Sequence, residues 1–535
     1  MSRFNLIDEK WIPVRFPDGT RDELGILDTL LRSKEIVDIE DPSPFVVAAL
    51  YRFLLAVLYR ALEGPTDPDQ AKALFRNDLP DGKITSYLQK WRDLNRFWLF
   101  DEKYPFGQIP TFEPKTWRAW TALAAEHNAD NAKVLFDHVN VTVSGSISPA
   151  AALRWLLATQ TFAVSAGKSE ISHTGTAPSA GSVMAIPIGL NLKDTLIFCL
   201  IPQNREIMQA DVPSWEKEPE SLQYLKSTIR VLDKKSGKEK DRAIERSSTG
   251  IVDLFTWRTR SIVFKESLSD DVSEVGLASG IGYIESVVLD PMLSYNIVEI
   301  SESETEEKIK KRVPLHFEEK EFWRDFDSLL PDDAHLAPKV IENAVMLSKI
   351  DRKRLPKGIM IIGQRYFPPR PNIAFWRKEY FVLPEAISGD RNIRHDIRDF
   401  LTAAEKAGHE LKNACEAFAR DILRHGERKV EKKDIRNFVE QLSAPDQYWS
   451  ALESSFHEIL REYTLDRDFE VIRCQWLKSV RESLLYAWEQ HRASFSVGDA
   501  WAIRALVKAE RSVRRKLNEL NDEIRKLELQ KEESL

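Results

Sequence analysis

The sequence SAGKS at residues 165–169 resembles the end of a phosphate-binding loop. In such loops, backbone N–H groups bind phosphate oxygens, and the lysine contacts the terminal phosphates. The full motif G-x-x-x-x-G-K-S begins with a glycine, but Phe162 occupies that position here. The sequence therefore disfavours a nucleotide triphosphatase. What remains is a loop of small residues with one lysine, a composition that lets the backbone approach a nucleic acid closely.

Two groups of histidine and aspartate could in principle bind a divalent ion, because both side chains are metal ligands. The first is the adjacent pair His395 and Asp396. The second contains Asp332, Asp333 and His335, which follow a proline in a stretch typical of a turn, where aspartate is favoured. A metal phosphohydrolase needs further ligands at ordered spacings, and the sequence contains no HExxH or G-x-S-x-G motif. We therefore expect no catalytic residue, no metal and no cofactor.

The composition limits the kinds of partner and compartment. The chain has 77 Lys and Arg against 84 Asp and Glu, so any nucleic-acid contact must use a local basic patch. Its three cysteines, Cys199, Cys415 and Cys474, are far apart and form no CxxC pair, which argues against disulfides or a zinc ribbon. The opening residues lack the apolar core of a signal peptide. We expect a cytoplasmic protein.

The first part of the chain mixes β-like and helical segments. Short β-like runs occur at 11–15 and 185–190, and helical patterns occur at 45–62 and 149–163. The segment 45–62 is the most apolar in the chain, but two arginines interrupt it and it is at the short limit for a membrane span. We interpret it as a core helix, with no membrane contact.

The amino-acid composition of the chain changes near residue 390. From there to the end the chain has a single proline, Pro445, and few glycines. Apolar residues recur at helical spacing, which predicts a helical bundle. The amphipathic segments are 392–408, 409–425, 432–463, 468–491 and 497–531. The last one carries a basic cluster, which indicates either a solvated, salt-bridged face or a ridge that faces nucleic acid. The cluster comprises Arg511, Arg514, Arg515 and Lys516.

The opening run FNLIDEKWIPV at residues 4–14 resembles the amino-terminal signature of the CasA family, the large subunit of type I-E CRISPR Cascade complexes. Two further stretches follow in the family's order, namely YPF at 104–106 and QTFAVSAGKS at 160–169. The resemblance covers essentially the whole chain. It implies an α+β protein: a large mixed α/β domain at 1–390 for PAM recognition and crRNA-handle docking, and an all-α four-helix bundle at 391–535.

The resemblance also implies a function. Such a subunit recognises the protospacer-adjacent motif (PAM) in double-stranded target DNA, helps to unwind the duplex for crRNA pairing and R-loop formation, and provides a docking surface for a recruited helicase-nuclease. Its other partners are the remaining Cascade subunits and the crRNA, and it is not an enzyme. Two alternatives stay open: a metal-dependent nuclease or phosphohydrolase that uses His395 and Asp396, and a purely structural scaffold of a ribonucleoprotein.

Three sets of site residues follow from the resemblance. The PAM-binding loop corresponds to Ala166, Gly167, Lys168 and Ser169. The loop that anchors the subunit to the crRNA handle and the complex corresponds to 128–141, with contact residues Asn131, Phe136, Asp137 and His138. The wedge that separates the strands corresponds to a hairpin tip with Arg370, Pro371 and Asn372, and Gln364 is the alternative wedge residue.

The family's minor-groove lysine should fall within residues 279–285, but this sequence has no lysine there. The sequence therefore does not show which residue takes the role of that lysine. Three nearby basic residues are candidates to replace it, namely Arg258, Arg260 and Lys265.

Overall fold

The chain forms two compact units in the computed structural model. Unit 1 comprises Met1–Glu319 and Ser328–Phe381, and unit 2 comprises Lys320–Asp327 and Val382–Leu535. The boundary expected near residue 390 lies in a stretch outside the described residues. These are 3–124, 145–164, 175–232, 237, 239–265, 271–284, 288–301, 308–330, 335–366, 373–384, 393–424, 429–464, 467–495 and 499–534.

Helix α2 (Pro44–Leu62) forms the centre of unit 1. Ser43 caps it by accepting from the backbone N–H of Val46, and Pro44 suits the first turn, where a backbone donor has no helical partner. Every residue of α2 except Arg60 is buried. Among the described helices it alone is long and apolar enough to span a membrane, and 94% of that apolar window lies inside the protein. The predicted core helix is therefore confirmed.

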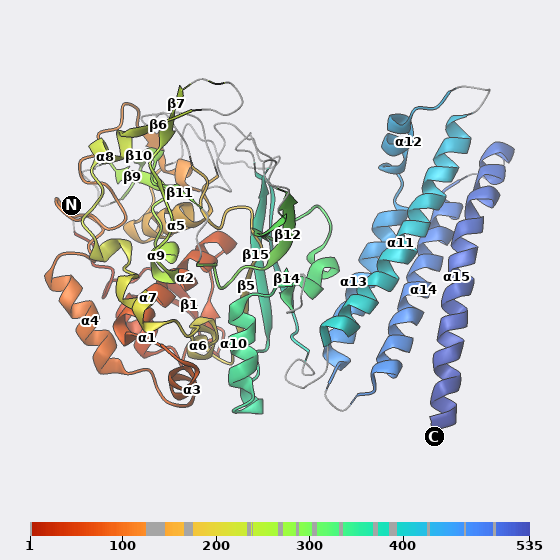
Figure 1. Cartoon of the computed structure of the whole chain (residues 1–535), viewed down its shortest axis with the longest axis horizontal. Coiled ribbons are helices and arrows are strands. Elements are labelled where there is room, and N and C mark those ends of the chain that lie inside the picture. Colours follow the sequence, from red (N-terminus) through yellow and green to blue (C-terminus); the bar gives the residue numbers. More distant parts are fainter. Residues whose placement is uncertain are drawn as a thin grey trace. The chain divides into compact units, whose positions relative to one another are not determined.

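A three-stranded antiparallel sheet packs beside α2. Its order is β16 (Ile373–Phe381), β15 (Gly358–Tyr366) and β5 (Met184–Ile188). Central strand β15 contacts α2, and helices α6 (Leu192–Cys199) and α10 (Lys339–Ser348) pack against β5. Figure 1 shows α10 continuing below β5 and β15. Strand β15 is nearly all buried, which fits its apolar sequence GIMIIG.

Five further sheets complete the described strands of unit 1. Strand β13 is an edge strand of its sheet, and its sequence KIKKRVP is basic. The sheets are β2 (Arg21–Leu24), β1 (Ile12–Arg15) and β3 (Asp38–Ile39); β4 (Arg118–Ala119), β10 (Glu274–Ser279) and β9 (Arg260–Phe264); β13 (Lys308–Pro314), β12 (Tyr295–Ser301) and β14 (His335–Leu336); and the pairs β6 (Thr228–Leu232) with β7 (Glu239–Ala243) and β8 (Glu245–Arg246) with β11 (Gly282–Tyr283).

The remaining described α-helices of unit 1 are mostly short. Helix α5 (Pro149–Phe162) matters most for the site below, because its last turn precedes the predicted DNA-binding loop. The others are α1 (Ile26–Leu31), α3 (Pro68–Arg76), α4 (Asp81–Asp93), α7 (Arg205–Ala210), α8 (Leu222–Lys226) and α9 (Ile251–Phe255).

Unit 2 is a bundle in which four long helices lie alongside one another (Figure 1). These are α11 (Ile393–Leu423), α13 (Ala444–Glu462), α14 (Phe469–Ala493) and α15 (Ala500–Ser534). The short helix α12 (Lys432–Val439) lies between α11 and α13 in the sequence. Trp323, from the separate segment Lys320–Asp327, is fully buried and contacts the rings of Phe456 and Trp476. This aromatic contact explains why a segment distant in sequence belongs to the bundle.

Two details of the predicted bundle are wrong. The segments 392–408 and 409–425 form the single helix α11, because Gly408 continues the helix and provides space for a neighbouring ring. A Cβ at Gly408 would lie 2.5 Å from Trp449. The segment 432–463 is instead divided into α12 and α13, with Pro445 in the first turn of α13.

The basic cluster of α15 has acidic partners within the bundle. Arg514 pairs with Glu510, Lys516 pairs with Glu519, and Arg515 pairs with Glu410 on α11. The interpretation as a salt-bridged face is therefore confirmed for these three residues.

Candidate nucleic-acid interface

Described residues within or next to three predicted DNA-contacting segments line one cavity of unit 1. Gly175 and Thr176 follow the loop segment 165–174, and Tyr366 precedes the predicted wedge. Gly280 and Tyr283 belong to the stretch expected to reach the minor groove. We call this space of about 380 Å³ the junction cavity. It is lined by Gly175, Thr176, Ala177, Pro178, Ala180, Ser182, Glu245, Gly280, Gly282, Tyr283, Pro314, His316 and Tyr366.

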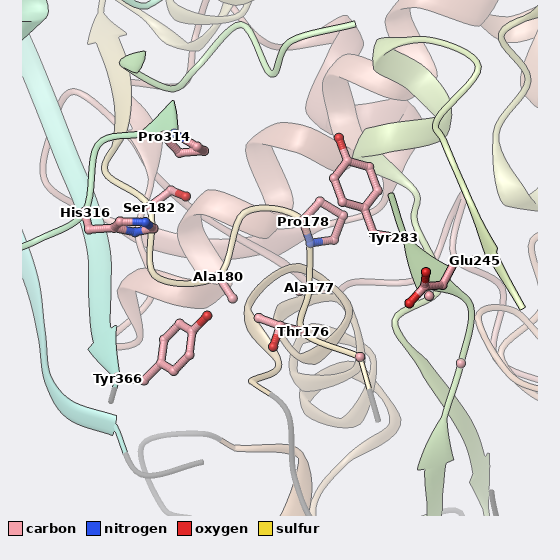
Figure 2. Close-up of a pocket in the computed structure, with 13 residues that line it drawn as sticks. Thr176, Ala177, Pro178, Ala180, Ser182, Glu245, Tyr283, Pro314, His316 and Tyr366 are labelled. Carbon is pink, nitrogen blue, oxygen red and sulfur yellow. The ribbon is translucent and has the colours of Figure 1, made fainter. Parts of the chain in front are cut away.

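Figure 2 shows how the walls of the junction cavity are arranged. Tyr366 and His316 lie on one side, Tyr283 and Glu245 lie on the other, and the segment 176–182 runs between them. The Nδ1 of His316 donates to the carbonyl of Gly181 at 2.8 Å. Gly181 has φ +76°, and a Cβ there would lie 2.6 Å from the ring of Tyr366. The wall thus depends on glycine for both conformation and space.

The opposite wall is held close to strand β9 by backbone contacts. Gly280 donates to the carbonyl of Thr259 at 2.8 Å, and Ile281 donates to that of Arg258 at 3.0 Å. A Cβ at Gly280 would lie 2.2 Å from the Arg258 carbonyl oxygen. This approach requires glycine at position 280, so the turn in the stretch where a lysine was expected is defined by backbone packing.

Arg258 and Arg260 do not reach outward in place of that lysine. The two residues are only 8% and 5% exposed, respectively. Arg258 donates to Glu220 at 3.3 Å, and Arg260 donates to the carbonyls of Val164 and Gly175. The hypothesis that either arginine reads a DNA groove is therefore wrong for this structure. Lys265 is more exposed, at 42%, and pairs with Glu274.

The end of helix α5 is fixed by a set of buried amide contacts. The side chain of Gln160 accepts from the N–H of Arg260 and donates to its carbonyl, both at 2.8 Å. The hydroxyl of Thr259 donates to the carbonyl of Gln160 at 2.8 Å. Each group therefore satisfies a buried polar partner, as a buried network requires. Together these contacts fix where the chain enters the predicted DNA-binding loop.

Gln364, the alternative wedge residue, belongs to the same support. It lies in β15, is fully buried, and donates through Nε2 to the carbonyl of Phe162 at 2.6 Å. A side chain in this position does not reach DNA, so the structure argues against Gln364 as the wedge. The other wedge residues, Arg370, Pro371 and Asn372, lie outside the described residues.

Sequence reasoning missed the supporting roles of Gln160, Arg260 and Gln364. The available signal was a polar residue inside an otherwise apolar helix or strand, as in LLATQTF and RSIVF. Such a pattern suggests a buried hydrogen bond, but it does not identify the partner.

The remaining predicted site residues are placed only in part. Ala166, Gly167, Lys168 and Ser169 lie outside the described residues, as do Asn131, Phe136, Asp137 and His138. Asp332 and Asp333 also lie outside them, whereas His335 is in β14. His395 and Asp396 lie on α11, where His395 is 3.8 Å from Asp399, and Asp396 accepts from the hydroxyl of Tyr463. Within the described part of the chain, no three His, Cys, Asp or Glu side chains are grouped to hold a metal.

Strand β13, which ends at the junction cavity, is basic. The described lining contains Glu245 and no lysine or arginine. Strand β13 ends at Pro314 on the cavity wall, and its Lys310 and Lys311 are exposed. A basic strand next to a polar cavity is the kind of local patch that an acidic chain needs for contact with phosphates.

Comparison with known proteins identifies the family. The family model described as CRISPR-associated protein Cse1 matches residues 5–487. CRISPR-associated protein CasA/Cse1 of Thermus thermophilus is 29% identical over 534 residues, covering 98% of this chain and 99% of that protein. A solved structure of Thermus thermophilus CasA (Cse1) has a TM-score of 0.79 and 27% identity, with 97% and 100% of the two chains covered.

More distant structures share the fold. Cse1 from Acidimicrobium ferrooxidans superposes with a TM-score of 0.76 at 22% identity, covering 98% of this chain and 99% of that one. A chain of a CRISPR RNA-guided surveillance complex superposes with a TM-score of 0.70 at 20% identity, covering 97% and 99%. The predicted fold class, a mixed α+β protein with a carboxy-terminal helical region, is confirmed. The chain therefore belongs to the Cse1 (CasA) family of CRISPR-associated proteins.

Proposed function

We propose that this chain is the large subunit of a type I-E CRISPR surveillance complex that recognises the PAM in double-stranded target DNA and helps to open the duplex for crRNA pairing. The proposal rests mainly on one structural observation. Described residues that flank the small-residue loop and the wedge segment line the same junction cavity as residues of the 279–285 stretch. Three segments with separate predicted contacts to one short DNA element need such a common location.

The chemistry of these segments suits minor-groove recognition. The loop at 165–169 is made of small residues and one lysine, so backbone groups and a cation can approach the duplex together. The minor groove offers few distinguishing groups, so its readout depends on geometry. The described ends of the loop, Val164 and Gly175, and the turn at 279–284 are held by hydrogen bonds, which supports such a readout.

Separating the two DNA strands beside the PAM requires little additional free energy. R-loop formation exchanges one duplex for another of similar stability, so a group that fills the opened base step can shift the balance. The sequence PPRPN at 368–372 contains three prolines, which restrict backbone rotation, and a restricted tip would lose little entropy on entering the step. Strand β15 ends at Tyr366 on the cavity wall, immediately before this segment.

The same proposal covers the assembly. The chain docks to other Cascade subunits and to the crRNA through 128–141, and presents a surface to a recruited helicase-nuclease. The fold shared with a chain of a CRISPR RNA-guided surveillance complex supports this assembly. The proposal assigns the chain a binding function without catalysis, in the cytoplasm. The alternative nuclease gains no support from His395 and Asp396, which contact Asp399 and Tyr463 on the bundle.

A gel shift with reconstituted complexes tests the function. Complexes with and without this chain are titrated against duplexes that differ only in the PAM. We expect the complete complex to prefer the PAM-bearing duplex, and the complex that lacks the chain to lose this preference. A complete complex that assembles with the chain but binds both duplexes equally would support the scaffold alternative instead.

A further inference from the structure

Arg260 joins the two ends of the predicted DNA-binding loop. Its Nη2 donates to the carbonyl of Val164 at 2.5 Å, and its Nη1 donates to the carbonyl of Gly175 at 2.7 Å. These are the last described residue before the segment 165–174 and the first one after it. The backbone N–H of Ala177 donates to the carbonyl of Ala163 at 2.8 Å, which also holds the two ends of the loop together.

The surroundings of Arg260 are unusual for a buried cation. The side chain is 5% exposed, and within the described part of the chain no carboxylate lies within ion-pair distance. Its Nη1 also donates to the carbonyl of Thr259 at 3.0 Å, so backbone carbonyl dipoles are its described acceptors. Burial lowers the pKa of Arg260 to about 10, which leaves it charged at neutral pH. Burying such a charge is unfavourable, and an apolar side chain would avoid that cost.

The shape of arginine explains why it occupies this position. The guanidinium is a flat, rigid group with five N–H donors, so it can hold two carbonyls at a fixed separation and angle. A lysine ammonium carries the same charge but is a single point with rotatable donors. The backbone of Arg260 is itself fixed by the side chain of Gln160, which accepts from its N–H and donates to its carbonyl.

We propose that Arg260 is a positioning residue for PAM recognition: by bridging Val164 and Gly175, it fixes the points at which the segment 165–174 leaves and rejoins the fold. This inference rests on the proposed function and adds a residue with a defined role to it. Arg260 acts through the loop and does not contact DNA.

The test compares Arg260→Lys with Arg258→Lys in the reconstituted complex. Arg258 is the matched control, because it is a neighbouring buried arginine that contacts Glu220 and the carbonyl of Gln108 and neither end of the loop. Arg260→Lys keeps the charge and loses the two-point bridge. We expect its affinity for PAM-bearing DNA to fall about tenfold, the effect of losing one charge-assisted hydrogen bond, and its affinity for DNA without a PAM to fall less. Arg258→Lys should leave the ratio of the two affinities at the wild-type value.

Trypsin cleavage after Lys168 provides a readout that needs no DNA. We expect Arg260→Lys to be cut there several times faster than wild type, relative to its other sites, and Arg258→Lys to be cut at the wild-type rate. If Arg260→Lys does not accumulate as folded protein, Gln160→Met is used instead, because it removes side-chain contacts that hold the backbone of Arg260. Gln160→Met should show both the lower affinity for PAM-bearing DNA and the faster cleavage after Lys168. Unchanged cleavage and an unchanged affinity ratio in the folded variant would overturn the proposal, as would equal losses in Arg258→Lys.

Lys168→Ala separates this inference from the proposed function. If Lys168→Ala weakens DNA binding and Arg260→Lys leaves the PAM preference intact, the positioning role fails and the proposed function stands. If the wild-type complex itself shows no PAM preference, the proposed function fails, and the cleavage result alone decides whether Arg260 fixes the loop.

Discussion

Replacing Arg52 with methionine should destabilise unit 1 by a calculable amount. Arg52 lies on α2 and is 2% exposed, and its Nη1 is 2.5 Å from the carboxylate of Asp290, which is 4% exposed. The same carboxylate accepts from the hydroxyl of Ser179 at 3.0 Å, on the segment beside the junction cavity. The pair therefore connects the core helix to that segment, and removing one partner leaves a buried charge behind.

The expected size follows from general values for buried pairs. Breaking one costs about 3–5 kcal/mol. A unit of about 370 residues unfolds with an entropy near 0.8 kcal/mol/K, at roughly 2 cal/mol/K for each residue. The melting temperature of unit 1 should therefore fall by about 4–6 °C in Arg52→Met. Differential scanning calorimetry of the full chain measures this shift.

Two further variants show whether the buried charge is the cause. Adding Asp290→Asn to Arg52→Met removes the charge and keeps an acceptor for Ser179, so the double variant should melt above Arg52→Met. Arg21→Met is the surface control: Arg21 is 72% exposed and pairs with Glu40, and such a pair contributes about 0–1 kcal/mol. A shift below about 1 °C in Arg52→Met, or no recovery in the double variant, would refute the reasoning.

Four further predictions concern the interface itself. Lys168→Ala should weaken binding to all duplexes alike and reduce the slope of log affinity against log salt by about one unit, if Lys168 contacts a phosphate; unchanged affinity and slope would remove it from the interface. Replacing 368–372 with a flexible glycine-serine link should slow R-loop formation on paired DNA and spare a target already open beside the PAM. Equal defects on both targets would contradict a wedge. Gln364→Met should leave that paired-to-open comparison unchanged, because its amide bonds the buried carbonyl of Phe162; a loss confined to paired DNA would restore Gln364 as the wedge. Phe136→Ala should loosen the chain from the reconstituted complex on size exclusion without changing its melting temperature, and full co-elution at low concentration would count against the anchoring role.

Local sequence patterns predicted the main elements where one physical signal dominates. The apolar run at 45–62 and the segment at 149–163 correspond closely to α2 and α5, since continuous or periodic burial defines a helix without reference to the rest of the chain. The bundle was predicted for the same reason. Its helix boundaries were less accurate, because Gly408 continues α11 through packing against Trp449, a residue distant in sequence.

The supports of the candidate site depend on partners that local patterns do not reveal. Gln160 bonds Arg260 across a separation of 100 residues, and Gln364 bonds Phe162 across 202. A sequence indicates that such polar residues need partners but does not show which groups fold beside them. The family resemblance predicted DNA contacts for the segments at 165–169 and 368–372. That described residues flanking these segments, such as Thr176 and Tyr366, line one cavity became visible only in the fold.

Site-specific photo-crosslinking can show directly whether the junction cavity lies at the PAM. A photoreactive residue is placed at Thr176, Tyr283 or Tyr366, which lie around the junction cavity, and at Lys72 on α3, which is not among its lining residues. Each chain is assembled into the complex and irradiated with labelled target duplex. The account predicts that all three cavity positions crosslink to base pairs within or next to the PAM and that position 72 does not. Crosslinks from the cavity positions to DNA away from the PAM, or no crosslinks from a complex that binds its target, would contradict it.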